Sequence, residues 1–143
     1  MASSVTVIVA VFFSVVALGT GTGIAPVTLA VAGGLLGFLL FNVYPASVFM
    51  GDTGSLALGG FVASVTYMLN MPLFILLVGF IYLVEVLSVI IQVTYFKATH
   101  GKRFFKMAPI HHHFEKCGWS ETRVVTVFSI IEAFCCLIAL AAM

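Results

Sequence analysis

The sequence predicts an all-α protein, a polytopic bundle of transmembrane helices with about five spans in this chain. Hydrophobic residues make up 62% of the 143 residues and charged residues only 8%, whereas a soluble domain carries about 25% charged residues. The mean hydropathy is +1.24. The apolar residues gather in five stretches that approach or reach the roughly 20 residues a helix needs to cross the hydrocarbon core. Most of the surface therefore belongs in lipid.

The sequence signals that predict the first three spans differ in strength. Residues 1–18 are uncharged throughout. Residues 24–41 open with Pro26, a residue that is favoured in the first turn of a helix. Residues 55–69 are short for a span, and we expect that helix to borrow residues from the segment before it.

The last two expected spans, residues 72–96 and 124–143, hold the acids of the apolar regions. Glu85 and Gln92 lie seven residues apart in the first of these spans, so a helix places them on one face, about two turns apart. For Glu85 we expect a hydrogen bond that packs the helices, whereas Gln92, near the end of the span, can line a site. Glu132, in the last span, is expected inside the bundle, because acids in spans seldom face lipid.

The distribution of charge predicts the topology. All six Lys and Arg residues lie within residues 97–123, and such residues next to spans are retained on the cytoplasmic side. With short turns at residues 19–23 and 70–72, counting spans places residues 42–55 on the same side. The N-terminus is then inside and the C-terminus outside. The two polar segments are therefore expected to meet at one membrane surface.

The first polar segment, residues 42–55, is predicted to be a cytoplasmic loop built around Asp52. Gly51 and Gly54 flank this aspartate, so backbone can approach a ligand closely. One carboxylate next to phosphate groups suits Mg²⁺, which takes few protein ligands. A helix N-cap is the alternative role for Asp52, and the two roles are compatible. The match of residues 52–55 to the aspartic protease signature is a coincidence, since those enzymes need two such aspartates in a β-rich fold.

The second polar segment, residues 97–123, is predicted to be a cytoplasmic loop that is basic and rich in histidine. Its Lys and Arg residues can neutralise phosphate groups of a substrate or of anionic lipid headgroups. Three successive histidines, His111 to His113, cannot share one face of a helix, so the run alone does not predict a three-histidine metal site. These side chains are better suited to donate hydrogen bonds to phosphate or to handle a proton near neutral pH. Pro109 predicts a break just before them.

Both polar segments carry motifs of one family. The chain reads VFMGDTGSLALGG over residues 48–60, KRFFKMAPIHHHFE over residues 102–115 and GWSE over residues 118–121. These stretches, with Phe41-Asn42 and Pro45-Ala46 before them, resemble the phospho-N-acetylmuramoyl-pentapeptide transferase family. The resemblance covers essentially the whole chain.

The resemblance implies a Mg²⁺-dependent phosphosugar transferase. Such an enzyme moves phospho-MurNAc-pentapeptide from UDP-MurNAc-pentapeptide to undecaprenyl phosphate and gives lipid I and UMP in peptidoglycan synthesis. It implies a bacterial cytoplasmic membrane location, with the active-site loops facing the cytoplasm, and membrane lipid as surroundings. No nucleic-acid partner is expected.

The resemblance also assigns roles to positions of this sequence. Asp52 matches a catalytic or metal-binding aspartate, and the histidine run matches an essential motif. Phe49 matches an aromatic residue near the uracil. The expected catalytic residues are Asp52, His111, His112 and His113, with Asp52 the Mg²⁺ ligand. The expected substrate-binding residues are Asn42, Phe49, Gly51, Gln92, Lys102 and Lys106.

The chain departs from the family in its length, which is about half of the usual one. The upstream Asp-Asp pair and the Asp-rich loop of the family are absent. Residues 1–143 are therefore expected to be a single transmembrane domain that corresponds to the C-terminal half of a larger transferase. The protein partners left open are a separate N-terminal half and a homo-oligomer. A non-catalytic membrane fragment that needs a separate N-terminal half is the alternative function. A transporter-like bundle would need more polar residues at mid-membrane than this chain has.

Overall fold

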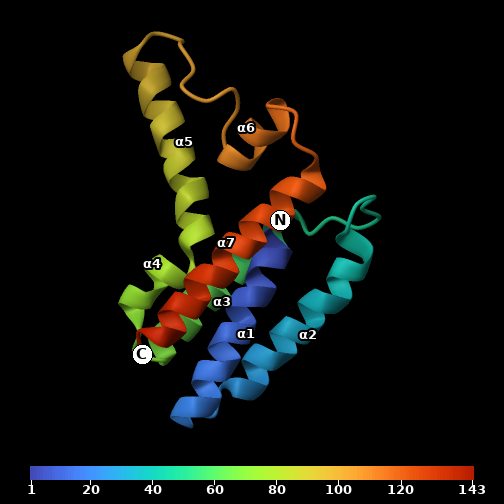
Figure 1. The fold of residues 1–143 in the computed structure, drawn as a ribbon, viewed down its shortest axis with the longest axis vertical. Helices are drawn as coiled ribbons and strands as arrows, with labels where there is room; N and C mark the ends of the chain where they lie inside the picture. Colours follow the sequence, from blue (N-terminus) through green and yellow to red (C-terminus); the bar gives the residue numbers. More distant parts are fainter.

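A computed structural model describes all residues, 1–143, and shows an all-helical protein without strands, as the sequence predicts. The polar 97–123 region is not a plain loop, because it contains a short helix of its own (Figure 1). The elements in chain order are α1 (Ala2–Thr20), α2 (Ala25–Asn42), α3 (Gly51–Met68), the 3₁₀ turn η1 (Pro72–Phe74), α4 (Ile75–Val78), α5 (Phe80–Ala98), α6 (Ile110–Lys116) and α7 (Glu121–Ala141).

Four helices, α1, α2, α5 and α7, are long and apolar enough to cross a membrane. The shorter third span is present as α3, which begins at Gly51 and so takes in part of the preceding polar segment, as expected. Its share of glycine and polar residues keeps it outside the group of four. The expectation of about five spans is consistent with these helices.

The predicted fourth span is wrong in its continuity, because the helix breaks at Gly79. This residue has φ −118° and ψ 26°, and it separates α4 from α5. A Cβ atom at this position would lie 2.8 Å from the carbonyl oxygen of Ile75. The close approach of the two backbones therefore requires glycine, and the long spanning helix begins only at Phe80.

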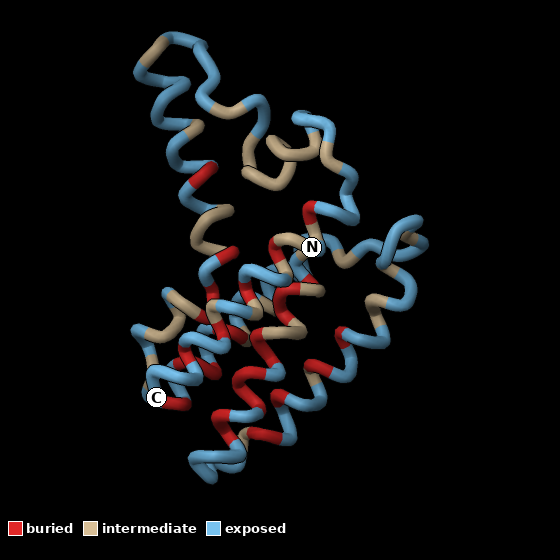
Figure 2. The backbone as a smooth tube through the Cα atoms, viewed as in Figure 1, coloured by how far each residue is buried: buried red, intermediate tan, exposed pale blue.

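Helix α1 lies at the centre of the bundle. It contacts α2, α3 and α7, and 56% of its apolar stretch is buried, whereas α5 is 11% buried. Figure 2 shows the buried residues gathered along α1 and the helices beside it, while the far half of α5 is almost wholly exposed. The most buried core side chains include Val5, Val9, Phe13, Val78 and Val124.

Buried polar side chains link the helices. Ser14 donates a hydrogen bond to Thr28 (2.8 Å), which joins α1 to α2. Thr6 and Tyr82 share a hydrogen bond of 2.6 Å between α1 and the first turn of α5. These pairs satisfy groups that would otherwise be costly in an apolar interior.

Glu132 on α7 is fully buried, which confirms the expectation that it lies inside the bundle. Its Oε2 atom accepts a hydrogen bond from the backbone N–H of Ile81 at 3.0 Å. The first N–H groups of a helix have no partner within the helix. A carboxylate from the last helix therefore caps the first turn of α5 at the break.

The two polar segments lie at the same end of the bundle (Figure 1). The loop after α2, helix α6 and the N-terminus all lie near the start of α7, whereas the C-terminus lies at the opposite end. The arrangement of ends deduced by counting spans is therefore the one observed. The side of the membrane that this end faces stays a prediction.

Candidate active site

The segment between α2 and α3 folds back on the end of α2. The side-chain amide of Asn42 donates to the carbonyl oxygen of Val48 at 2.7 Å. Ser47 donates from its hydroxyl and from its backbone N–H to the carbonyl oxygen of Phe41, at 3.0 and 2.8 Å. Asn42, predicted to bind substrate, thus also shapes the loop that presents Phe49.

Asn42 and Phe49 share a pocket of about 410 Å³ at this end of the bundle. Its other walls are the first residues of α1 and the first turns of α7. The Phe49 ring is 81% exposed, so one of its faces is free to stack on a planar group. The lining residues are Met1, Ser4, Leu39, Asn42, Val43, Tyr44, Ala46, Phe49, Glu121, Thr122, Val125 and Thr126.

Asp52 lies in the first turn of α3 and is exposed. Its side chain makes no hydrogen bond or ion pair, and the residue at the N-cap position is Met50, so the capping alternative is not realised. A carboxylate in the first turn still interacts favourably with the helix dipole. Gly51 precedes it with φ +66°, a left-handed conformation that favours glycine. The left-handed backbone at Gly51 therefore forms the entry into α3 directly before the free carboxylate.

The predicted Mg²⁺ site can be compared with the acidic, histidine and cysteine side chains of the chain. No group of three or more His, Cys, Asp or Glu side chains is placed to hold a metal ion. Asp52 offers one unpaired carboxylate, which fits a Mg²⁺ ion that takes most of its ligands from phosphate oxygens and water. The described residues therefore fit as one ligand and do not form a closed cage.

Three polar side chains on one face of α5 hold the segment that carries the histidines. Gln92 accepts a hydrogen bond from the backbone N–H of Phe105 at 2.8 Å. Ser88 accepts one from the backbone N–H of Ile110 at 3.0 Å. The third side chain is Glu85, so the three positions follow the spacing i, i+3 and i+7 that places residues along one helix face. We call Glu85, Ser88 and Gln92 the α5 polar stripe.

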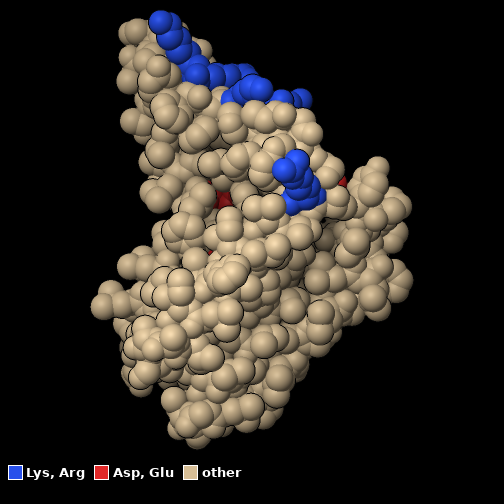
Figure 3. All heavy atoms as spheres, viewed as in Figure 1, with Lys and Arg blue, Asp and Glu red and all other residues tan.

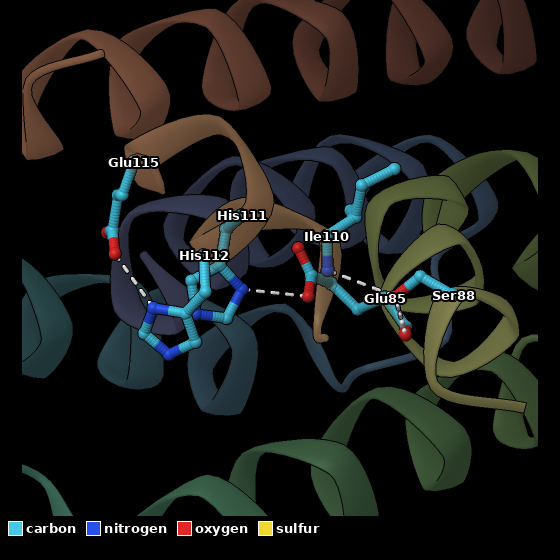
Figure 4. A network of polar contacts seen from close by, with 6 residues as sticks. All are labelled: Glu85, Ser88, Ile110, His111, His112 and Glu115. Atoms are coloured by element: carbon cyan, nitrogen blue, oxygen red, sulfur yellow. Dashed lines mark hydrogen bonds and ion pairs between the residues drawn. The ribbon is translucent and has the colours of Figure 1, made fainter. Parts of the chain in front are cut away.

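The histidine run begins α6, directly after Pro109 at the N-cap position, where the sequence predicts a break. Nδ1 of His111 lies 2.8 Å from Oε2 of Glu85. Nδ1 of His112 lies 2.7 Å from Oε2 of Glu115, one turn along the same helix. The two imidazole centroids are 4.0 Å apart, so two carboxylate–imidazole pairs stand side by side (Figure 4).

His113 points another way. Its Nδ1 accepts a hydrogen bond from the backbone N–H of Lys106 at 3.1 Å, and its ring packs edge-on against Phe105. The three rings therefore have different polar partners: Glu85 for His111, Glu115 for His112 and the backbone of Lys106 for His113. His113 fixes the preceding loop, while His111 and His112 pair with carboxylates.

Aromatic side chains fasten α6 to α7. The ring of Phe114 lies 5.0 Å from that of Trp119 and 6.0 Å from that of Phe128, measured between centroids. The guanidinium of Arg123 lies 4.4 Å above the Trp119 ring, in cation–π contact. Helix α6 is thus held by polar contacts on its α5 side and by aromatic contacts on its α7 side.

The cations form a basic edge above these contacts (Figure 3). A pocket of about 460 Å³ opens beside it, lined by Gln92, Lys97 and Arg103 with apolar residues of α5. Lys102 and Lys106, predicted to bind substrate, are both exposed. The Lys106 ammonium reaches the carbonyl oxygen of Lys116 at 3.5 Å. Exposed ammonium groups of this kind are available to phosphate oxygens.

The structure groups the predicted site residues into two clusters. Asn42 and Phe49 share one pocket, and Gln92 joins the histidines through the α5 polar stripe. Asp52 has no hydrogen bond or ion pair to either cluster. Sequence reasoning found the polar face of α5 but gave Glu85 a role in packing between helices. The expected hydrogen bond of Glu85 is present and joins α5 to α6, and its partner is His111 of the histidine run. The i, i+7 spacing to Gln92 was the available signal that this face meets the site.

Comparison with known proteins bears directly on this arrangement. A family model described as glycosyl transferase family 4 matches residues 1–70. The phospho-N-acetylmuramoyl-pentapeptide-transferase of Clostridium botulinum (strain Eklund 17B / Type B) is 62% identical over 100% of this chain. This chain is homologous to these transferases over its whole length. The proteins of the same name from Clostridium perfringens (strain 13 / Type A) and Clostridium acetobutylicum are 58% and 57% identical, over 100% and 97% of the chain.

The family resemblance inferred from the motifs is therefore confirmed. The alignments cover 44%, 45% and 44% of those three transferases, so the chain spans less than half the length of the relatives it matches. Both polar segments lie inside the aligned region, since the first alignment takes in the whole chain.

Proposed function

We propose that this chain forms part of a transferase that moves phospho-MurNAc-pentapeptide from UDP-MurNAc-pentapeptide to undecaprenyl phosphate. The observation that carries the proposal is 62% identity over the whole chain to a protein of that name. The geometry supports it, because free acidic, basic and imidazole groups gather at one end of an apolar bundle. A lipid substrate and a water-soluble nucleotide can meet only at such a boundary.

The proposed step is a phosphoryl transfer at the β-phosphorus of the UDP-sugar. An oxygen of the lipid phosphate attacks this phosphorus, the bond to the UMP oxygen breaks, and UMP leaves while lipid I forms. Such reactions depend mostly on positioning and on neutralising charge. Mg²⁺, held in part by Asp52 when bound, would neutralise the diphosphate.

The remaining roles are proposed from side-chain exposure and from side-chain atoms that have no hydrogen-bond partner within the chain. Phe49 offers an exposed ring to stack on the uracil, next to Asn42 in the same pocket. Lys102 and Lys106 offer exposed ammonium groups to the phosphates. His111 and His112 bind carboxylates through Nδ1 only, so each keeps Nε2 for a substrate oxygen.

We further propose that this end of the bundle faces the cytoplasm, since all six basic residues lie there. The alternative is a non-catalytic membrane fragment that acts only with a separate N-terminal half. The observation that favours it is coverage of only 44% of a homologous transferase.

Transfer activity in membranes tests the proposal. The chain, alone or co-expressed with the N-terminal part of a homologous transferase, receives UDP-MurNAc-pentapeptide, undecaprenyl phosphate and Mg²⁺, and lipid I is followed by chromatography. We expect lipid I with the N-terminal part present, and its loss on chelation by EDTA or on Asp52→Asn. Lipid I from the chain alone would reject the need for the other part. No lipid I in either case, with both parts folded, would favour the inert fragment.

A further inference from the structure

We propose that Glu85 is a positioning residue for His111, holding the hydrogen on its Nδ1 atom so that the bare Nε2 atom can accept a proton from a substrate phosphate group that carries one. The inference rests on the proposed transferase function. It assigns a role to a carboxylate of a spanning helix that no motif marks as part of the site.

The first argument is geometric. Oε2 of Glu85 lies 2.8 Å from Nδ1 of His111, across the interface between α5 and α6. The Glu85 side chain is 14% exposed and that of His111 is 23% exposed. A charge-assisted hydrogen bond at this distance, partly shielded from water, is stronger than an exposed one.

The second argument concerns the other oxygen. Oε1 of Glu85 is buried and has no hydrogen-bond partner. A carboxylate in a spanning helix is energetically unfavourable, and an unpaired buried oxygen makes it more so. Because the helix carries this acid despite its unfavourable surroundings, a role beyond packing is the better account.

The third argument is chemical. An ionised carboxylate has no hydrogen to donate, so the shared hydrogen must belong to the imidazole at Nδ1. In a neutral imidazole, a hydrogen on Nδ1 leaves a lone pair on Nε2. Nε2 of His111 makes no hydrogen bond within the chain. Glu85 therefore selects the tautomer that can accept a proton or a hydrogen bond on the open side.

The fourth argument separates positioning from anchoring. The backbone of the loop is already held by the other members of the α5 polar stripe, Ser88 at Ile110 and Gln92 at Phe105. The aromatic contacts of Phe114 hold α6 from its other side. Loss of the Glu85 carboxylate thus leaves the loop in place and changes mainly the state of the His111 ring.

The neighbouring pair provides a matched control. Glu115 and His112 have the same chemistry and a similar distance, 2.7 Å, but the pair lies within α6 and its carboxylate is 34% exposed. Exposed i, i+3 pairs contribute little. Glu115→Gln therefore removes an equivalent charge near the same two rings without touching the link between α5 and α6.

The tautomer is tested on this chain directly, without any activity. The chain has four histidines, so selective ¹⁵N-histidine labelling in lipid bicelles gives few signals, and His111→Gln identifies those of His111. We expect His111 to show a protonated Nδ1 and a bare Nε2. Glu85→Gln, whose amide can donate as well as accept, should lose this preference, whereas Glu115→Gln should alter His112 and leave the His111 tautomer in place.

The catalytic consequence is tested in the transferase that makes lipid I in the assay above. Glu85→Gln should lower kcat by about 10- to 100-fold, by analogy with the range found when the carboxylate that orients a metal-ligating histidine is removed, with KM for the UDP-sugar within about twofold. Glu85→Asp, which restores the charge, should recover part of this loss, and Glu115→Gln should cost less than Glu85→Gln.

The outcomes are distinguishable. Unchanged His111 signals in Glu85→Gln, or wild-type kcat in that variant, would overturn the positioning role while leaving the transferase function intact. A wild-type protein with the expected tautomer but no transfer activity with its N-terminal part would reject the proposed function, and the positioning role with it. Loss of both the tautomer and kcat, with rescue by Glu85→Asp, supports the inference.

Discussion

Replacing Glu132 tests whether the break before α5 depends on a carboxylate from α7. Glu132 is fully buried, and its Oε2 accepts the backbone N–H of Ile81 at 3.0 Å. Truncation to alanine removes that acceptor, which is worth about 1 kcal/mol for a polar contact between membrane helices. It also leaves a cavity of the kind that costs about 2–5 kcal/mol in a packed core.

One effect acts against these losses. Oε1 of Glu132 is buried without a partner, and removal of such a group raises the free energy of unfolding by about 1–3 kcal/mol. We therefore expect Glu132→Ala to lower the free energy of unfolding by about 2 kcal/mol. Glu132→Leu keeps most of the volume and removes the same orphan oxygen, which offsets the lost acceptor, so its stability should lie within about 1 kcal/mol of wild type. Glu132→Gln keeps a carbonyl acceptor and turns the orphan oxygen into a donor, so it should lie within about 0.5 kcal/mol of wild type.

The assay is reversible unfolding of the chain by SDS from mixed micelles, followed by circular dichroism, with amide hydrogen exchange at Ile81 as a local readout. Exchange at Ile81 should rise in the Ala and Leu variants and stay slow in Gln. Slow exchange at Ile81 in both the Ala and the Leu variants would refute the capping role.

Three further predictions concern the active-site end. Asp52→Asn should lower kcat for lipid I by at least about 100-fold without changing the circular dichroism spectrum, and near-wild-type turnover would contradict its role. Gly51→Ala forces a side chain into a φ of +66° and should destabilise the chain by about 1–2 kcal/mol in the same unfolding assay. Gln92→Leu removes the acceptor for the Phe105 N–H, so exchange of that amide should speed up about tenfold, whereas Gln92→Glu should keep it slow.

The helices were predictable because hydropathy is a local property. Residues 1–18 and 24–41 were expected as spans and largely coincide with α1 (Ala2–Thr20) and α2 (Ala25–Asn42), and Pro26 lies in the first turn of α2, where its fixed φ is compatible with the helix. Counting spans also placed both polar segments at one end, since parity depends only on the number of crossings. The break at Gly79 was missed because a glycine within an apolar run does not by itself show a break, and the cap that Glu132 provides at Ile81 joins distant parts of the chain.

The candidate site was predictable in its residue types and less so in its contacts. Pro109 marked the start of α6, and the spacing of Glu85 and Gln92 marked a shared face. The sequence could not reveal that this face meets the histidine loop, because helix orientation is set by packing. For Asp52, the sequence left open whether the side chain caps α3, and in the structure Met50 holds the N-cap position and no side chain makes a capping hydrogen bond.

The α5 polar stripe makes the loop move with its helix. Helix α5 is fastened to the bundle at its first turn, through Ile81 and Tyr82, and is exposed along most of its length. At 1.5 Å per residue, Glu85 lies roughly 9 Å and Gln92 roughly 20 Å beyond Gly79. A tilt of about 5° about that point would carry these side chains by roughly 0.8 and 1.7 Å relative to the part of α6 that aromatic contacts hold against α7. Misplacement of reacting groups by about 1 Å can cost a hundredfold in rate, and tilt is how a spanning helix adjusts to bilayer thickness. In the proposed transferase, lipid composition would therefore affect turnover through the tilt of α5.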